Sequence, residues 1–281
     1  MPKGHYARKP KNDAANIAAI KVNYSATTQE SDAEIEQRLG ERFDILDVLT
    51  EACTVGNARA LIISGPAGLG KSYTVEKRLR DWDPNELNHT IVKGYVRATG
   101  LVKLLYSYRE AGQVIVFDDA DAIFFDDVSL NLLKAVCDTT ERRHVSWMSE
   151  GKLIDEESAI LIPRTFEFEG TIIFITNYDF DAMIERGHKL APHLQAMVSR
   201  AHYIDCGMKT RRDYLVRIRQ VIKQGLLDFL DSQQRSDVIA YIDSNHHRLR
   251  ELSLRMALKL GSLRKSNDNW QRMANITCCK S

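Results

Sequence analysis

GPAGLGKS, at residues 65–72, matches the pattern G-x-x-x-x-G-K-[S/T] in full. The apolar run at residues 61–64 is typical of a strand, and residues 73–79 are typical of the first turns of a helix. This strand–loop–helix context is the one that a phosphate-binding loop requires. Glycines let the backbone turn so that successive N–H groups point at the phosphates, and the helix N-terminus adds partial positive charge. The stretch therefore predicts a site for a polyphosphate.

The residues of this loop have distinct expected roles. Lys71 should reach the β- and γ-phosphates of a nucleotide such as ATP, and the Ser72 hydroxyl should ligate Mg²⁺. The residues expected to bind the nucleotide are Gly65, Pro66, Ala67, Gly68, Leu69, Gly70, Lys71, Ser72 and Tyr73.

Composition excludes several classes of protein. The chain has 281 residues, of which 44% are apolar and 27% charged, as in an ordinary soluble globular protein. Its formal net charge of +1 gives no global attraction to nucleic acid or to an anionic membrane, so either would have to bind a local patch. The five cysteines lack zinc-ligand spacing, and no signal peptide or run of transmembrane length occurs. We therefore expect a cytoplasmic protein with no membrane partner.

Strand and helix patterns alternate along most of the chain. A capping-box pattern at residues 31–34 begins a helical stretch that has a possible break at Gly40 and ends near residue 56. Further strands are expected at 91–92, 114–117, 171–176 and 202–204, with helices at 100–108 and 129–139. This alternation predicts an α/β fold, a parallel sheet with helices on both faces.

Three parts and one excursion follow from these patterns. Residues 1–30 should form a flexible basic arm, which either contacts phosphates or is merely solvated, and residues 31–208 the α/β nucleotide-binding domain. Residues 209–281 should form a small all-α lid, because helical patterns at 210–224, 226–241 and 248–263 replace the strands. Within the α/β domain, alternation around a glycine-containing turn predicts a β-hairpin-like excursion at 141–170.

Polar residues follow two of the expected strands. Asp118 ends the run at 114–117 and is placed to hold Mg²⁺, and Asp119 is placed to act as the general base for the attacking water. Asn177 follows the strand at 171–176, where its amide could orient the water or the γ-phosphate. Without the two preceding motifs, Asn177 would be read as a turn residue.

The series GPAGLGKS, VIVFDD and IIFITN, then Ser199-Arg200 before a short strand and a helical lid, resembles AAA+ ATPases over about residues 40–265. The stretches IVFDDAD and TFEFEGTIIFITN look like AAA+ ATPases encoded by bacteriophages. The resemblance implies hydrolysis of ATP with Mg²⁺ by a homo-oligomeric ring or open ring, with six as the expected number of subunits.

The resemblance also assigns residues. Asn177 matches the first sensor, Arg200 the arginine finger that acts on the neighbouring subunit's γ-phosphate, and Arg255 the second sensor on the lid. The adenine would lie near residues 42–45. Competing arginines are Arg142, Arg143 and Arg186 for the finger, and Arg248 and Arg250 for the second sensor.

One position departs from the family's pattern. The family's second signature more often ends in Asp-Glu, whereas this chain has Asp118-Asp119. The shorter side chain must hold the water differently, which bears on the rate of hydrolysis more than on the reaction itself.

The resemblance implies that hydrolysis moves a bound polymer or partner, but it does not identify that polymer. Phage ATPases of this kind often serve DNA metabolism, so a helicase, loader or replication accessory acting on nucleic acid in the host cytoplasm comes first. A protein remodeller or unfoldase is the second hypothesis, and an ATP-gated assembly module with little turnover is the third. Residues 94–100 contain Tyr95-Val96, which could be the aromatic–hydrophobic pair of a polypeptide translocator, and Arg97, which would suit a phosphate backbone. Either could instead be core or helix-start residues, so this segment does not decide between the first two hypotheses.

Overall fold

The first strand after the N-terminal helix lies inside a five-stranded sheet. A computed structural model describes residues 30–149, 151–155 and 159–280, so the expected basic arm lies outside the described residues except for residue 30. All strands pair in parallel, in the order β2-β3-β6-β1-β7. Their bounds are β1 (Ala60–Ser64), β2 (His89–Lys93), β3 (Val114–Asp118), β6 (Thr171–Thr176) and β7 (His202–Asp205). β1, β3 and β6 are buried along their whole length, which explains their continuous apolar runs.

Helices cover both faces of the sheet. Within β1, Leu61 and Ile63 pack in one core and Ile62 in the other, as alternating strand residues must. The first core includes α1 (Asp32–Thr54) and α2 (Lys71–Trp82). The second includes α3 (Ala98–Ser107), the 3₁₀ turn η2 (Asp121–Phe125), α4 (Asp127–Val136), α5 (Phe180–Glu185) and α6 (Ala191–Val198). The predicted parallel α/β sheet with helices on both faces is confirmed.

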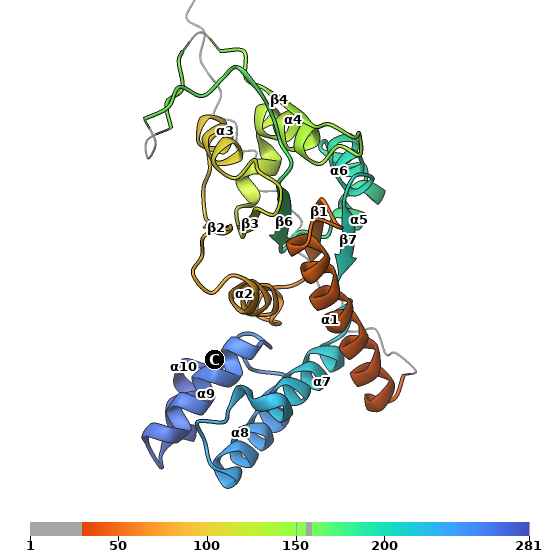
Figure 1. Cartoon of the computed structure of the whole chain (residues 1–281). Coiled ribbons are helices and arrows are strands. Elements are labelled where there is room, and N and C mark those ends of the chain that lie inside the picture. Colours follow the sequence, from red (N-terminus) through yellow and green to blue (C-terminus); the bar gives the residue numbers. More distant parts are fainter. Residues whose placement is uncertain (1–29, 150, 156–158, 281) are drawn as a thin grey trace, which may run out of the picture.

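Helices alone follow β7, apart from one isolated bridge between Leu249 and Cys279 in the described residues. They are α7 (Arg211–Val221), the π-helical turn η3 (Ile222–Leu226), α8 (Ser232–Asn245), α9 (Leu254–Ser266) and α10 (Trp270–Thr277). These helices, blue in Figure 1, gather at the end of the molecule away from β4, and α1 reaches from the sheet to α7. The predicted all-α part after the sheet is therefore confirmed.

Two helices of this part begin later than their apolar patterns predict. The pattern at 226–241 starts before α8, which begins after Asp231, whose Oδ1 accepts a hydrogen bond from Gln234 N at 2.8 Å. The pattern at 248–263 starts before α9, which begins after Ser253, whose Oγ accepts from Met256 N at 3.0 Å. In both cases a side-chain cap, rather than the first apolar residue, sets the start of the helix.

α1 runs without the break expected at Gly40. Its start has the predicted capping box, in which Ser31 N donates to Glu34 Oε2 at 2.6 Å and Glu34 N donates to Ser31 Oγ at 3.3 Å. A Cβ at Gly40 would stand 3.2 Å from Gln220 Nε2 on α7. A side chain at this position would therefore crowd the Gln220 amide, which donates to Glu36 O at 3.2 Å.

The segment between α4 and β6 leaves the main sheet. β4 (His144–Ser146) and β5 (Thr165–Glu167) pair antiparallel, and an isolated bridge joins Ile154 to Leu161 farther along the excursion. Trp147, directly after β4, is half-buried and packs against the second core.

Candidate functional site

The loop between β1 and α2 bends at glycines that face the helical part of the molecule. Gly68 and Gly70 have φ of +76° and +101°, a left-handed conformation that favours glycine. A Cβ at Gly68 would stand 2.7 Å from Ser253 Cβ, and the Gly68 carbonyl accepts a hydrogen bond from Leu254 N at 2.7 Å. The loop is therefore closed on one side by the N-terminus of α9.

Lys71 lies buried at the start of α2, 4% exposed. Its Nζ donates to the carbonyl oxygens of Gly65 at 2.5 Å and Pro66 at 2.8 Å, and to Asn177 Oδ1 at 3.1 Å. Burial lowers the pKa of the Lys71 ammonium, while nearby acidic groups, Asp119 among them, oppose that effect. Two carbonyl oxygens of the loop and the side-chain amide of Asn177, all uncharged, thus orient the Lys71 ammonium. Tyr73, two residues on, is 68% exposed.

Ser72 and Asp118 meet beside this cation. Ser72 Oγ donates to Asp118 Oδ1 at 2.9 Å, and Asp118 is 4% exposed. Mg²⁺ is usually bound by one or two protein oxygens together with waters and substrate phosphates, so this pair fits a magnesium–nucleotide complex. No group of three or more His, Cys, Asp or Glu able to hold a metal occurs in the described part of the chain.

Lys93, at the end of β2, is a neighbour of this pair that motif reasoning missed. Its Nζ lies 3.3 Å from Asp118 Oδ2 and 2.7 Å from Glu76 Oε1. Lys93 and Asp118 are partners in the register of β2 and β3. The sequence signal that could have identified Lys93 was a charged residue at the end of β2, the strand next to β3.

Asp119 and Asn177 are brought together by the adjacency of β3 and β6. Asn177 Nδ2 donates to Asp119 Oδ1 at 2.7 Å, while its Oδ1 accepts from Lys71. Asp119 has φ of +54°, a left-handed conformation that aspartate tolerates better than most residues, and its N–H donates to Ile175 O at 3.1 Å. One amide therefore links the cation of the loop to the exposed carboxylate predicted as the base.

Asp121, in the turn that follows β3, is a further carboxyl group beside this cluster. Its Oδ1 is buried without a hydrogen-bond partner. Burial, with a smaller contribution from the charge of Asp119, raises the pKa of Asp121 from 3.8 to about 6, although Thr176 opposes the shift. Asp121 is thus a second carboxyl group next to Asp119 that ionises less readily than an ordinary aspartate.

Asp121→Asn is expected to raise the free energy of unfolding at pH 7 by about 1–3 kcal/mol. Because the folded-state pKa of Asp121 is raised from 3.8 to about 6, the folded protein holds this proton more tightly than the unfolded chain does between those pH values. The contribution of Asp121 to wild-type stability should therefore fall as the pH rises through this window, and that contribution to the slope should vanish in the variant. Urea unfolding at a series of pH values measures both effects. Asp127→Asn, at an exposed position, should keep the wild-type slope, and the same slope in Asp121→Asn would contradict the expectation.

Arg255 lies next to the loop, whereas its competitors do not. Its Cδ would be 3.9 Å from a Cβ at Gly68. Arg248 Nη2 instead donates to Asn275 Oδ1 at 2.8 Å, and Arg250 is exposed. Among the arginines that compete for the second sensor, the geometry favours Arg255.

Arg200 is not brought to the site of its own chain. It lies before β7, at the amino-terminal ends of the parallel strands. Asp119 and Asn177 follow the carboxyl-terminal ends of β3 and β6, on the other side of the sheet's length. Its Nη1 donates to Ala196 O at 2.8 Å, and its Nε lies 3.7 Å from Asp138 Oδ2. A cavity of about 350 Å³ lies beside it.

The arginines that compete with Arg200 have other surroundings. Arg142 pairs with Glu167 at 2.7 Å. Arg143 is buried and donates to the carbonyls of Val136 and Gly170. Arg186 is exposed after α5.

The segment expected near the adenine packs against α7 and the end of β7. Arg42 Nη1 donates to Asp205 O. The ring of Phe43 lies under the guanidinium of Arg217, with 3.5 Å between Cζ and the ring centroid. Arg217 is a second residue near the loop that sequence reasoning missed.

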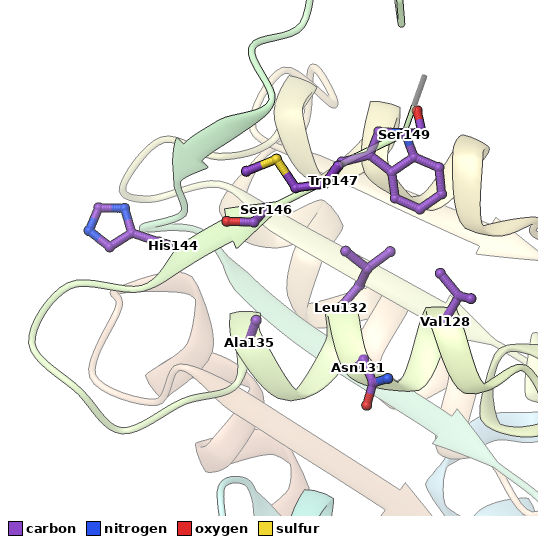
Figure 2. A pocket seen from close by; sticks show the side chains of 9 residues that line it. Val128, Asn131, Leu132, Ala135, His144, Ser146, Trp147 and Ser149 are labelled. Carbon is purple, nitrogen blue, oxygen red and sulfur yellow. The ribbon is translucent and has the colours of Figure 1, made fainter. Parts of the chain in front are cut away.

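A separate cavity of about 420 Å³ lies between α4 and residues 144–149, where Trp147 stands over Val128 and Leu132 (Figure 2). None of the predicted nucleotide-binding residues lines it. Within the described residues, no helix has the length and apolar character needed to span a bilayer.

No family model matches the sequence. The chain is 38% identical over 271 residues to an uncharacterized 36.7 kDa protein from the nrdC–mobD intergenic region of Enterobacteria phage T4, and the alignment covers 93% of this chain and 78% of that protein.

Solved structures show a weaker likeness. NtrX from Brucella abortus is 13% identical with a TM-score of 0.39, over 83% of this chain and 54% of that chain. A structure of NtrX with ATP is also 13% identical, with a TM-score of 0.35, over 71% of this chain and 42% of that chain. PCH-2 from C. elegans is 11% identical with a TM-score of 0.34, over 85% of this chain and 63% of that chain. This chain thus spans less than two thirds of each of these structures, and its fold is assigned from its own strand order and loop.

Proposed function

We propose that this chain, which belongs to the same family as the 36.7 kDa protein of Enterobacteria phage T4, is an AAA+ ATPase that hydrolyses ATP with Mg²⁺. The observation that carries the proposal is the meeting of Lys71, Asn177 and Asp119 through hydrogen bonds of 3.1 and 2.7 Å at the carboxyl edge of a parallel sheet. A phosphate-binding loop, a cation and a carboxylate in this arrangement serve phosphoryl transfer to water.

Each side chain of the site has a role in this reaction. The N–H groups of the loop and the ammonium of Lys71 would bind the β- and γ-phosphates. Ser72 and Asp118 would hold Mg²⁺, which neutralises charge on the phosphate oxygens. Asp119 would accept a proton from the attacking water, and Asn177 would keep that carboxylate in place beside Lys71. The left-handed backbone at Asp119 turns the chain directly after β3. This turn would help to position the carboxylate of an aspartate, which is shorter than the glutamate more frequent in the family, for its role as the base.

Arg255 would complete the site from the helical lid of its own chain, and Arg200 from the α/β domain of a neighbouring subunit. Because Arg200 lies at the amino ends of the strands, away from the site of its own chain, it would act on the site of a neighbouring subunit in a ring or open ring, with six subunits the first expectation. Arg255 lies beside Gly68 at the start of α9, so it would contact the nucleotide from the helical lid of residues 209–281.

We propose further that this ATPase serves DNA metabolism in the cytoplasm of the host cell and that it acts on single-stranded DNA. The support comes from the loop after β2, where Tyr95 is 71% exposed and Arg97 is also exposed, while Val96 packs against the core. An aromatic ring beside a cation suits base stacking and phosphate contact. A polypeptide translocator would instead present the aromatic residue together with its apolar neighbour, and here that neighbour faces inward.

An ATPase assay with added polymers tests this proposal. With Mg²⁺ present, wild-type protein should release phosphate from ATP, and single-stranded DNA should stimulate the rate severalfold. Tyr95→Ala/Arg97→Ala should keep the basal rate and lose the stimulation, whereas Arg186→Ala, at another exposed arginine, should keep both. Stimulation by an unfolded protein alone would favour a remodeller. Nucleotide-dependent assembly with almost no turnover would favour an ATP-gated module.

A further inference from the structure

Arg217 on α7 is a buried cation that has no ion-pair partner among the residues that the structure describes. It is 5% exposed, and its Nε is buried without a hydrogen-bond partner. Its Nη1 donates to Gln220 Oε1 at 2.8 Å, an uncharged acceptor. Asp44 acts on it electrostatically but forms no ion pair with it, and burial lowers the pKa of Arg217 to about 10. Because taking a guanidinium out of water costs free energy, buried arginines are normally paired with carboxylates or phosphates.

The guanidinium lies where α7, α1 and the phosphate-binding loop meet. Its Nη2 would be 3.8 Å from a Cβ at Gly70, the residue directly before Lys71. Its Cζ is 3.5 Å from the centroid of the Phe43 ring, which fixes the plane of the guanidinium. Leu254 Cδ1, at the start of α9, would be 3.4 Å from the same Cβ at Gly70. Side chains of α1, α7 and α9 thus surround Gly70, and the cation of α7 is among them.

A purely structural role does not explain this arrangement. An apolar side chain of similar length would pack against Phe43 without the cost of desolvating a charge, and even paired buried charges can often be replaced by apolar residues of similar volume with a neutral or stabilising effect. Among ligands of the nucleotide site, only the phosphates carry a negative charge. A purine base could accept a hydrogen bond from Nε but would leave the positive charge uncompensated.

We propose that Arg217 is a phosphate-binding residue that α7 adds to the nucleotide site, its guanidinium pairing with the di- or triphosphate of the bound nucleotide. The proposal rests on the proposed ATPase function and adds a residue to it. Guanidinium groups bind phosphate oxygens through charge-assisted and often bidentate hydrogen bonds. Through this contact, a bound nucleotide would tie the first lid helix directly to the loop that holds it.

Titration calorimetry with ADP and ATP, competition with adenosine, and thermal unfolding without nucleotide test the proposal. Arg217→Met should weaken ADP and ATP binding by roughly 10- to 100-fold, leave adenosine competition unchanged, and leave the nucleotide-free Tm equal or higher. Arg217→Lys, which keeps the charge, should lose less affinity. Arg219→Met, on the same helix, removes a cation that is paired with Asp243 at 2.7 Å, so it should lower the Tm and keep ADP affinity.

Three results would overturn the role of Arg217: unchanged ADP affinity in Arg217→Met, an equal loss of affinity for ADP and adenosine, or a lower nucleotide-free Tm with affinity intact. The second result would indicate a base contact, and the third a structural cation. A wild-type protein that bound no nucleotide would overturn the proposed function as well. Wild-type binding that Arg217→Met leaves unchanged would overturn only the present inference.

Discussion

Lys71→Ala is expected to lower the rate of ATP turnover by roughly 10²–10³-fold. Lys71 Nζ is held by the carbonyls of Gly65 and Pro66 and lies 3.1 Å from Asn177 Oδ1, so its charge is oriented before any substrate arrives. A methyl group at this position cannot reach a phosphate oxygen or offset the charge that develops as the γ-phosphoryl group leaves. Steady-state phosphate release at saturating ATP and Mg²⁺ measures the effect.

The matched control is Lys77→Ala, which removes an exposed lysine from the same helix. This variant should keep the wild-type rate, and both variants should retain the far-ultraviolet circular dichroism of the wild type. Full turnover by a folded Lys71→Ala protein would refute the assignment of the site. Loss of turnover together with loss of the folded spectrum would instead call for Lys71→Met, which keeps the length of the buried side chain but removes its charge.

The part of the site that follows buried strands can be predicted from the sequence. Asp119 comes directly after β3 and Asn177 directly after β6, and the carboxyl ends of neighbouring parallel strands meet at one edge of the sheet. The apolar runs before them mark the strands, and the glycine loop marks where β1 enters the same edge. Local patterns thus give the strand ends, and the two residues meet because β3 and β6 are neighbours in the sheet, an order that the local patterns do not contain.

Side chains that reach the loop from helices cannot be found in this way. Arg217 lies between Val216 and Ile218, so a cation on the apolar side of α7 was the available signal. Periodicity gives the face of a helix that will be buried but not the element against which that face packs. The approach of α7 to Gly70 depends on contacts between segments far apart in the chain, which a sequence pattern does not contain.

The predicted starts of α8 and α9 are wrong for a different reason. Asp231 and Ser253 end irregular segments that contain apolar residues, and an apolar pattern carried backwards through such a segment looks helical. The side-chain oxygens of these two residues compete for the backbone N–H groups that a longer helix would use. The capping box formed by Asp231 and Gln234 was readable in advance, whereas the cap at Ser253 lacks an acidic or amide partner at the corresponding position.

Arg200→Ala is expected to lower ATP turnover by roughly 10³–10⁵-fold while leaving ATP affinity nearly unchanged. Within its own chain, Arg200 Nη1 donates to Ala196 O and its Nε lies 3.7 Å from Asp138 Oδ2, a contact too long to hold the guanidinium firmly. Its side chain is 32% exposed and lies at the amino-terminal ends of the strands, away from Asp119. Phosphate release and nucleotide titration on the same preparation separate rate from affinity, and Arg186→Ala should behave as the wild type.

A mixture of two inactive variants tests whether Arg200 acts on a neighbouring subunit. Arg200→Ala subunits keep a complete Asp119 site, and Asp119→Asn subunits keep the arginine. In a randomly mixed ring with equal amounts of each, about a quarter of the interfaces would combine an intact site with an intact arginine, so about a quarter of wild-type turnover should return if sites act independently. The two variants kept apart should stay inactive. If sites act independently, no recovery in a mixture that still forms mixed oligomers would mean that Arg200 does not act between subunits, because each intact interface would then turn over by itself.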